Sequence, residues 1–190
     1  NDYTKNVNGK DETVPGIASI LEKAGVCKKE DFLSALYDVK LNGKLLSSAD
    51  EDRTYYTLEG YLFPETYEFY SFDSAECAKL AVEKMINESE KRITDKMYSR
   101  AEELGYSMNE ILTMASIIQM ESGQNAAEMP NVAAVFYNRL NSKEFSTLGS
   151  SPTCYYGNSF KRDDKRYDTY TAKGLPPGPL CSPSINAIKA

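Results

Sequence analysis

Apolar residues recur at helical spacing along five segments of the chain, which predicts five helices. Gly25 is a typical stop after the first of them. Asp73 with Glu76, and Ser107 with Glu110, have the spacing of capping boxes and mark the beginning of two others. The predicted helices span residues 13–24, 29–39, 73–104, 107–121 and 131–140.

Two stretches lack this periodicity. Residues 55–70 are dense in aromatic side chains and have strand propensity, which Gly60 and Pro64 interrupt. From Phe145 onward the chain is rich in Pro, Ser, Thr, Gly and Tyr, as in a long surface loop or in a set of loops that forms a site. We expect an α+β fold with a small N-terminal α/β subdomain over residues 1–53. A helix-rich domain with short strands and a loop-built cleft would follow over residues 54–190.

One carboxylate lies at an unusual place in this pattern. Glu121 follows Ile118 and Ile117 by three and four residues, so it falls on the apolar face of the helix over residues 107–121. Burial among aliphatic side chains and the partial negative charge at a helix C-terminus both favour the protonated carboxyl. A general acid that works near neutral pH needs that form. The alternative is that Glu121 reaches solvent beyond the last turn or pairs with an arginine.

The composition excludes several classes of function. The chain has 28 acidic and 22 basic residues, which does not fit the basic face of a nucleic-acid-binding protein. It has no histidine, so Ser-His-Asp and Cys-His catalysis and His-ligated zinc are excluded, and we expect no metal and no cofactor. No apolar run is long enough to cross a bilayer. The four cysteines form no CxxC motif, and four isolated thiols are favoured over two disulfides.

The remaining residue types suggest carbohydrate chemistry. Fourteen tyrosines could stack on sugars, and Ser and Thr hydroxyls could bind them, although the chain has no tryptophan. A standard glycosidase needs two carboxylates about 5–10 Å apart. Glu121 has no acidic partner at helical spacing, and Glu59 or Glu65 could approach it only through tertiary folding. A mechanism with a single carboxylate therefore fits at least as well as hydrolysis by a pair.

Six short segments, in order along the chain, carry a resemblance to a known family. They are LEGYLFPETY at 58–67, MASIIQME at 114–121, VAAVFYNRL at 132–140, SPTCYYG at 151–157, YDTYT at 167–171 and GLPPGP at 174–179. Together they resemble the motifs of the endolytic murein transglycosylases of the MltG, or YceG-like, family. Residues 7–26 are loosely similar to the segment that precedes these motifs in the family, which implies a LysM-like, partly truncated N-terminal subdomain.

The resemblance implies a lytic transglycosylase. Glu121 would act first as acid and then as base at the bond between N-acetylmuramic acid and N-acetylglucosamine, leaving a 1,6-anhydro end. No second carboxylate is required by this chemistry. The residues implied in substrate binding are Glu59, Tyr61, Asn138, Ser150, Ser151, Thr153, Tyr156, Thr169 and Tyr170.

The resemblance also implies partners and a location. The substrate would be peptidoglycan glycan strands, and cell-wall synthases would be partners, with no nucleic acid involved. The protein would work at the extracellular face of the bacterial cell membrane, held by an N-terminal anchor outside this chain. The catalytic domain over residues 54–190 would lack its C-terminal end.

This sequence departs from the family pattern in the loop that usually reads LQxDPT. Gly149 and Ser151 stand where the family has Gln and Asp, which favours, as the alternative function, a non-catalytic glycan-binding or scaffold module. Asp168 replaces an Asn, and Gln119 stands where an acidic residue is frequent. Cys154 and Cys181 both occupy loops near the implied site, so we also consider a disulfide between them.

Overall fold

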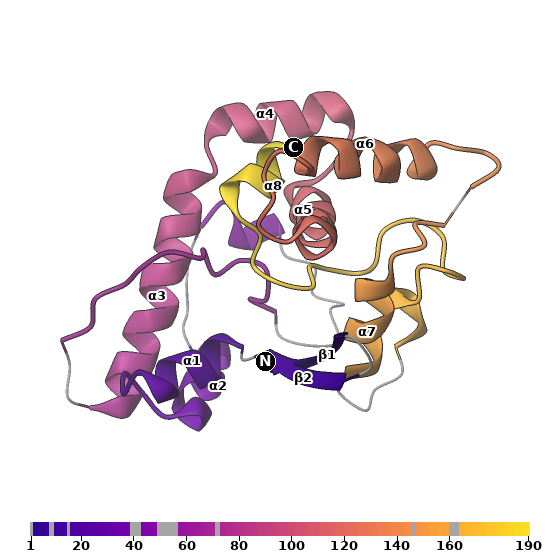
Figure 1. The fold of residues 1–190 in the computed structure, drawn as a ribbon. Coiled ribbons are helices and arrows are strands. Elements are labelled where there is room, and N and C mark those ends of the chain that lie inside the picture. The colour runs from indigo at the N-terminus through magenta and orange to yellow at the C-terminus, as the bar shows by residue number, and fades with distance from the viewer. Residues whose placement is uncertain are drawn as a thin grey trace.

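The computed structural model describes residues 2–7, 10–14, 16–38, 43–48, 57–70, 73–145, 147–159 and 164–190, and for the two strands it describes the backbone alone. The described part is helix-rich, as expected (Figure 1). The helices are α1 Ile17–Lys23, α2 Lys29–Asp38, α3 Ser74–Arg92, α4 Asp95–Leu104, α5 Met108–Ser122, α6 Met129–Leu140, α7 Ser151–Ser159 and α8 Ile185–Lys189, with the 3-10 turns η1 Leu46–Ser48 and η2 Lys165–Tyr167.

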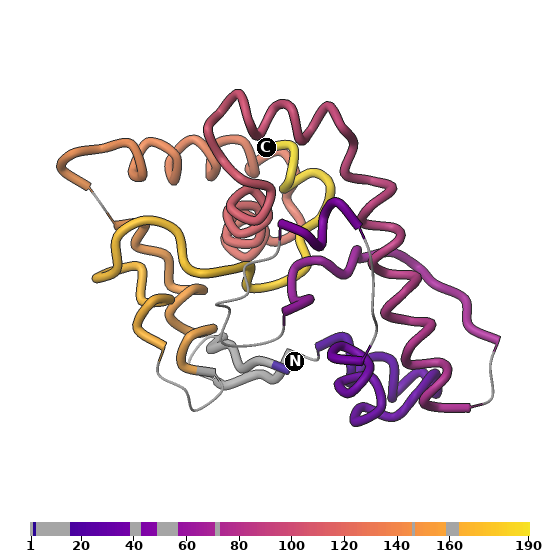
Figure 2. The backbone as a smooth tube through the Cα atoms, turned by 180° about the vertical axis from the view of Figure 1, so that it is seen from behind, coloured from indigo at the N-terminus to yellow at the C-terminus, as the bar shows by residue number. Residues whose placement is uncertain are grey.

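The chain begins with a β-hairpin. Strands β1 Tyr3–Val7 and β2 Lys10–Val14 pair antiparallel, with Tyr3 opposite Val14. The helix predicted from residue 13 therefore begins only at Ile17, because residues 13 and 14 are β-branched and belong to β2. The hairpin lies beside α7 (Figure 1). The two ends of the chain lie apart in the views from both sides, with the C-terminus close to α4 and α6 (Figures 1 and 2).

The long helix predicted over residues 73–104 is two helices. Asp73 caps α3 as expected, since its side chain accepts a hydrogen bond from the Glu76 backbone N–H at 2.9 Å. The helix ends at Ile93, whose backbone is extended and whose side chain is buried. Thr94 is extended as well, so α4 sets off in a new direction across the top of α5 (Figure 1).

Helix α5 connects the two hydrophobic clusters of the molecule. Its capping box is formed as predicted: the Glu110 N–H donates to Ser107 Oγ at 3.2 Å and the Ser107 N–H to Glu110 Oε2 at 2.8 Å. Met108 and Leu112 belong to a first cluster with α1, α2, α3 and α4. Residues from Met114 to Ile118 belong to a second cluster with α6, the residue 148–167 region and α8.

Strands are scarcer than expected. Residues 57–70, part of the predicted strand region, form turns and irregular structure. In the described residues beyond them, strand pairing is limited to an isolated bridge between Thr147 and Lys173. The region after residue 145, expected as loops, contains α7 and α8 besides its loops.

Two further expectations are not tested by the described residues and stay predictions. The proposed boundary between residues 53 and 54 lies outside the described residues. The likeness of the N-terminal part to a LysM domain is not tested by the hairpin and the helices that follow it. None of the helices in the described ranges combines the length and the apolar character that a membrane span needs.

Candidate active site around Glu121

Glu121 lies in the last turn of α5, and its side chain is exposed to solvent. Burial on the apolar face was therefore a wrong prediction. Every residue from Leu112 to Ile118 is buried, so the middle of α5 is surrounded on all sides and has no single apolar face. The last turn of the helix extends beyond the core. Glu121 is exposed because it lies in that turn.

The loop before α7 reaches the Glu121 carboxylate. Ser150 Oγ donates a hydrogen bond to Glu121 Oε1 at 2.6 Å, across 29 residues of sequence. The resemblance implied that both residues belong to one site, and the structure brings them into contact. Ser150 engages Oε1, and among the described residues no hydrogen bond to Oε2 is formed, so Oε2 is the oxygen that we assign to proton transfer.

Three predicted substrate-binding residues at this contact are buried. Ser150, Thr153 and Thr169 are 1%, 0% and 0% exposed. The Ser150 N–H donates to Thr169 Oγ1 at 3.0 Å, and the two threonine hydroxyls are 2.7 Å apart. A sugar cannot touch the buried threonines in this arrangement, which differs from the direct contacts that the resemblance implied.

A second, exposed layer is formed by the first residue of α7 and by the turn that follows η2. Ser151 Oγ and Tyr170 Oη form a hydrogen bond at 2.9 Å, and the Tyr170 side chain is 57% exposed. The ring of Tyr170 packs beside Gly149, where a Cβ would lie 3.8 Å from Cε1. Gly149 and Ser151, the two departures from the family loop, thus both contact Tyr170.

The aromatic segment supplies the residues farthest away in sequence. Glu59 accepts a hydrogen bond from the hydroxyl of Tyr156 on α7, which joins two predicted site residues. Tyr61 is fully buried, and its hydroxyl donates to Asn109 Oδ1 at 2.8 Å, so it is a core residue. Asn138 is exposed on α6, and in the described residues it forms no hydrogen bond with Glu121 or with Ser150.

Glu65, the other candidate for a second carboxylate, has a different partner. It forms an ion pair with Arg92 of α3 at 3.1 Å, and its side chain is 44% exposed. This pairing holds Glu65 toward α3, and Glu59 is held toward α7.

Two residues that support the site were not among the predicted binding residues. Arg139 Nη1 donates to the Leu148 carbonyl and so ties α6 to the start of the loop. Asp168 accepts hydrogen bonds from Thr171 Oγ1 at 2.9 Å and from Cys154 Sγ at 3.4 Å, which keep the pKa of the Asp168 carboxyl below its ordinary value. Arg139 lies in the NRL motif and Asp168 in the YDTYT motif, so their motifs could have identified them from the sequence.

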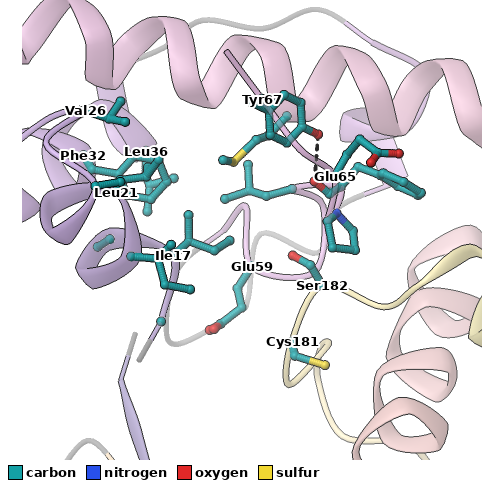
Figure 3. Close-up of a pocket in the computed structure, with 18 of the residues that line it drawn as sticks. Ile17, Leu21, Val26, Phe32, Leu36, Glu59, Glu65, Tyr67, Cys181 and Ser182 are labelled. Atoms are coloured by element: carbon teal, nitrogen blue, oxygen red, sulfur yellow. Dashed lines mark hydrogen bonds between the residues drawn. The ribbon is translucent and has the colours of Figure 1, made fainter. Parts of the chain in front are cut away.

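A large cavity lies apart from the Glu121 carboxylate. It has a volume of about 770 Å³ and opens between α1–α2 and the segment over residues 59–69 (Figure 3). Its lining is mostly apolar and includes Glu59, Glu65 and Ser182, but not Glu121. Glu59 points into the space between the N-terminal helices and the loop at Cys181 (Figure 3). The cavity is therefore a feature separate from the Ser150–Glu121 contact.

The cysteines do not form the considered disulfide. Cys154 lies near Asp168, whereas Cys181 Sγ points to the Ser116 carbonyl at 3.8 Å, so the two thiols belong to different surroundings. All four cysteines are within the described ranges and all are free. Burial raises the pKa of Cys181 to about 12 and that of Cys27 to about 11, so both thiols are protonated at neutral pH. In the described ranges no three His, Cys, Asp or Glu side chains are grouped to hold a metal ion.

Comparisons with known proteins agree with the resemblance. The chain is 32% identical over 147 residues to an endolytic murein transglycosylase of Streptococcus pneumoniae (serotype 2, strain D39), and this covers 71% of the chain and 26% of the relative. It is 32% identical over 142 residues to an endolytic murein transglycosylase of Bacillus subtilis (strain 168), covering 70% of the chain and 38% of the relative. The chain thus spans well under half of these relatives.

A solved structure and a family model cover most of the chain. The crystal structure of a yceG-like protein from Listeria monocytogenes matches 90% of this chain and 60% of its own, with a TM-score of 0.69 and 26% identity. The model of the YceG-like family matches residues 8–190. The chain therefore belongs to the YceG-like family.

Proposed function

We propose that this chain carries the catalytic portion of an endolytic peptidoglycan lytic transglycosylase. The observation that carries the proposal is the exposed Glu121 carboxylate, held by Ser150 on one oxygen with the other available for proton transfer. The names of the S. pneumoniae and B. subtilis relatives support the same chemistry.

The reaction would use Glu121 twice. Protonated Oε2 donates to the glycosidic oxygen between N-acetylmuramic acid and N-acetylglucosamine as the bond to C1 breaks. The resulting carboxylate, stabilised by the Ser150 hydroxyl, takes the proton of the muramyl C6 hydroxyl. O6 then closes onto C1, which gives a 1,6-anhydro end and returns Glu121 to its protonated form without consuming water.

Exposed tyrosines of α7 and of the turn after η2 would hold the glycan. Tyr170 and Tyr155 are 57% and 56% exposed, and pyranose faces stack on exposed aromatic rings. Ser151 fixes the Tyr170 hydroxyl, so this ring is oriented before a sugar arrives. The same layer also supports the alternative function, a glycan-binding or scaffold module, because Ser151 and Gly149 replace the family's more polar residues.

The location and partners follow from the substrate. Nascent glycan strands lie outside the cell membrane, so we place the domain at its extracellular face. An enzyme that cuts strands internally as they grow would work beside cell-wall synthases. A membrane anchor and a LysM-like N-terminal part belong to this proposal as properties of the family.

The decisive experiment is digestion of purified glycan strands by the full chain and by Glu121→Gln, followed by mass spectrometry of the products. We expect anhydro-muropeptides from the wild type and none from the variant, since an amide cannot donate and retake the proton. Glu128→Gln, an exposed carboxylate seven residues further on, is the matched control and is expected to retain activity. Equal thermal unfolding of the three proteins would show that the fold is intact.

The other outcomes separate the alternatives. Full activity of Glu121→Gln would contradict the catalytic assignment. Unaltered strands that co-sediment with the wild-type protein would indicate a binding module. Reducing ends in place of anhydro ends would indicate a hydrolase, which needs a second carboxylate.

A further inference from the structure

We propose that Thr169 is a positioning residue for Glu121. Its buried hydroxyl, together with that of Thr153, holds Ser150 in the orientation that donates to the Glu121 carboxylate. The inference rests on the proposed function, and it gives Thr169 and Thr153 a role beneath the site in place of direct sugar binding.

Thr169 accepts hydrogen bonds from two consecutive backbone N–H groups of the loop. The Gly149 N–H donates to the Thr169 carbonyl at 2.8 Å, and the Ser150 N–H donates to Thr169 Oγ1 at 3.0 Å. The second bond uses the side chain, so the backbone of Ser150 depends on the chemical identity of residue 169. The loop and the turn that contains Thr169 are therefore joined directly behind the Ser150 side chain.

The hydroxyl of Thr153 completes the network. Thr153 Oγ1 donates to the Ser150 carbonyl at 2.7 Å, and it lies 2.7 Å from Thr169 Oγ1. The protons balance when Thr169 accepts from the Ser150 N–H and donates to Thr153, which in turn donates to the Ser150 carbonyl. Both backbone groups of Ser150 are thus fixed by side chains that are 0% exposed.

Fixing Ser150 matters because Glu121 has little packing of its own. Glu121 is exposed in the last turn of α5, where its side-chain rotamers are not restricted by a surrounding core. The hydrogen bond from Ser150 Oγ at 2.6 Å is the contact that selects one of them. A donor from a rigid, buried support also stabilises the carboxylate formed after the first proton transfer.

Two charged side chains border the network, and both are engaged elsewhere. Arg139, from α6, donates to the Leu148 carbonyl. Asp168, from the turn, accepts from the Tyr170 N–H at 3.3 Å and from Thr171 Oγ1 at 2.9 Å. The donor that reaches Glu121 from the loop is the neutral Ser150 hydroxyl.

The test compares Thr169→Val, which keeps the shape of the side chain but removes the hydroxyl, with Thr169→Ser, which keeps the hydroxyl. The rate of anhydro-muropeptide release is measured against pH. For Thr169→Val we expect roughly tenfold lower kcat with little change in KM, as for loss of a hydrogen bond to a charged group. The pH profile of kcat should change as well, because the group that transfers the proton has lost its fixed hydrogen-bond donor. Thr169→Ser should behave as the wild type.

A double-mutant comparison links this effect to Ser150. Ser150→Ala should lower kcat further, and adding Thr169→Val to it should lower kcat no more. If Thr169→Val melts below the assay temperature, Thr153→Val carries the same test, because it leaves the Ser150 N–H paired with Thr169.

Two results would overturn the inference: full activity in Thr169→Val, or lower activity with an unmoved pH profile, which is what a purely structural role predicts. Neither result affects the proposed function, which is tested separately by Glu121→Gln and by the chemistry of the ends that the wild type releases.

Discussion

Gly60 and Gly105 have the same left-handed backbone in different surroundings. Their φ angles are +89° and +77°. A Cβ at Gly105 would have nothing within 4 Å, whereas a Cβ at Gly60 would lie 2.3 Å from Cβ of Pro179. Gly60 therefore brings the LEGYLFPETY motif against the GLPPGP motif, a contact that no larger residue permits.

The pair allows a matched prediction about stability. Gly105→Ala is expected to cost about 1 kcal/mol, from the left-handed backbone alone. Gly60→Ala is expected to cost about 1–3 kcal/mol more, because the proline ring cannot give way without moving its backbone. Urea unfolding at equal m-values measures both changes. Equal losses in the two variants would mean that the Pro179 contact contributes nothing.

Single residues also show what the sequence could and could not predict. Glu121 and Ser150 could be assigned to one site from the motifs, since the order of motifs along the chain is specific to the family. The exposure of Glu121 could not be predicted, because periodicity shows on which side of a helix a residue lies but not how deeply each turn is buried. The burial of Thr153 and Thr169 was missed for a related reason: hydroxyl-rich loops look alike whether they face solvent or bond to each other.

At the scale of elements, the N-terminus of α5 differs from that of α4. Ser107 and Glu110 form both halves of a capping box on α5. Thr94, at the N-cap of α4, makes no side-chain hydrogen bond to its helix. The same residue class at the same position is thus used for capping in one helix and not in the other.

We predict a difference between these two caps. Ser107→Ala is expected to destabilise the protein by about 1 kcal/mol, since it leaves a helix N–H without its acceptor. Thr94→Ala is the control and is expected to change stability by much less, because no capping bond is lost. Denaturant midpoints of the two variants measure the effect. A larger loss for Thr94→Ala would contradict the assignment of the caps.

Element boundaries were predictable where such local signals act alone. The N-cap residues Asp73 and Ser107 located the beginnings of α3 and α5 from a few neighbouring residues. The break between α3 and α4 was not predicted, because Ile93 continues the apolar pattern and leaves the helix in order to bury its side chain. Strand propensity in residues 57–70 was overridden by packing: Tyr61 is buried and Tyr67 and Phe69 pack against the core, whereas Tyr70 stays exposed.

At the scale of the whole molecule, Asp2 ties the start of the chain to both N-terminal helices. Its carboxylate accepts hydrogen bonds from the Gly16 N–H at 2.8 Å, Ser19 Oγ at 2.9 Å and Lys29 Nζ at 2.8 Å. The bond from Lys29 is the main reason that the pKa of Asp2 lies far below its ordinary value of 3.8.

This lowered pKa predicts a pH-dependent contribution to stability. A group with a depressed pKa in the folded state stabilises the protein above its unfolded pKa and loses that contribution as the pH falls. Asp2→Asn should therefore cost on the order of 1 kcal/mol at neutral pH, and the difference from wild type should shrink below about pH 4. Thermal melts of both proteins from pH 7 to pH 2 measure it.

The control for Asp2→Asn is Asp95→Asn. Asp95 also pairs with a lysine at 2.8 Å, but its side chain is 93% exposed, so solvent screens the pair and little change is expected at any pH. A constant difference between Asp2→Asn and wild type across the pH range would contradict the charge-based explanation.

Helix α5 also links the unfolding of the two hydrophobic clusters. Its first two turns are surrounded by the cluster that includes α1, α2, α3 and α4, and its remaining turns by the cluster that includes α6 and α8. A helix melts as a unit when its turns are packed at both ends, so loosening either cluster withdraws support from the other. Glu121, at the last turn, therefore reports on the integrity of the opposite half of the molecule. The position of the proposed acid–base group and the packing of both clusters thus depend on a single fifteen-residue segment.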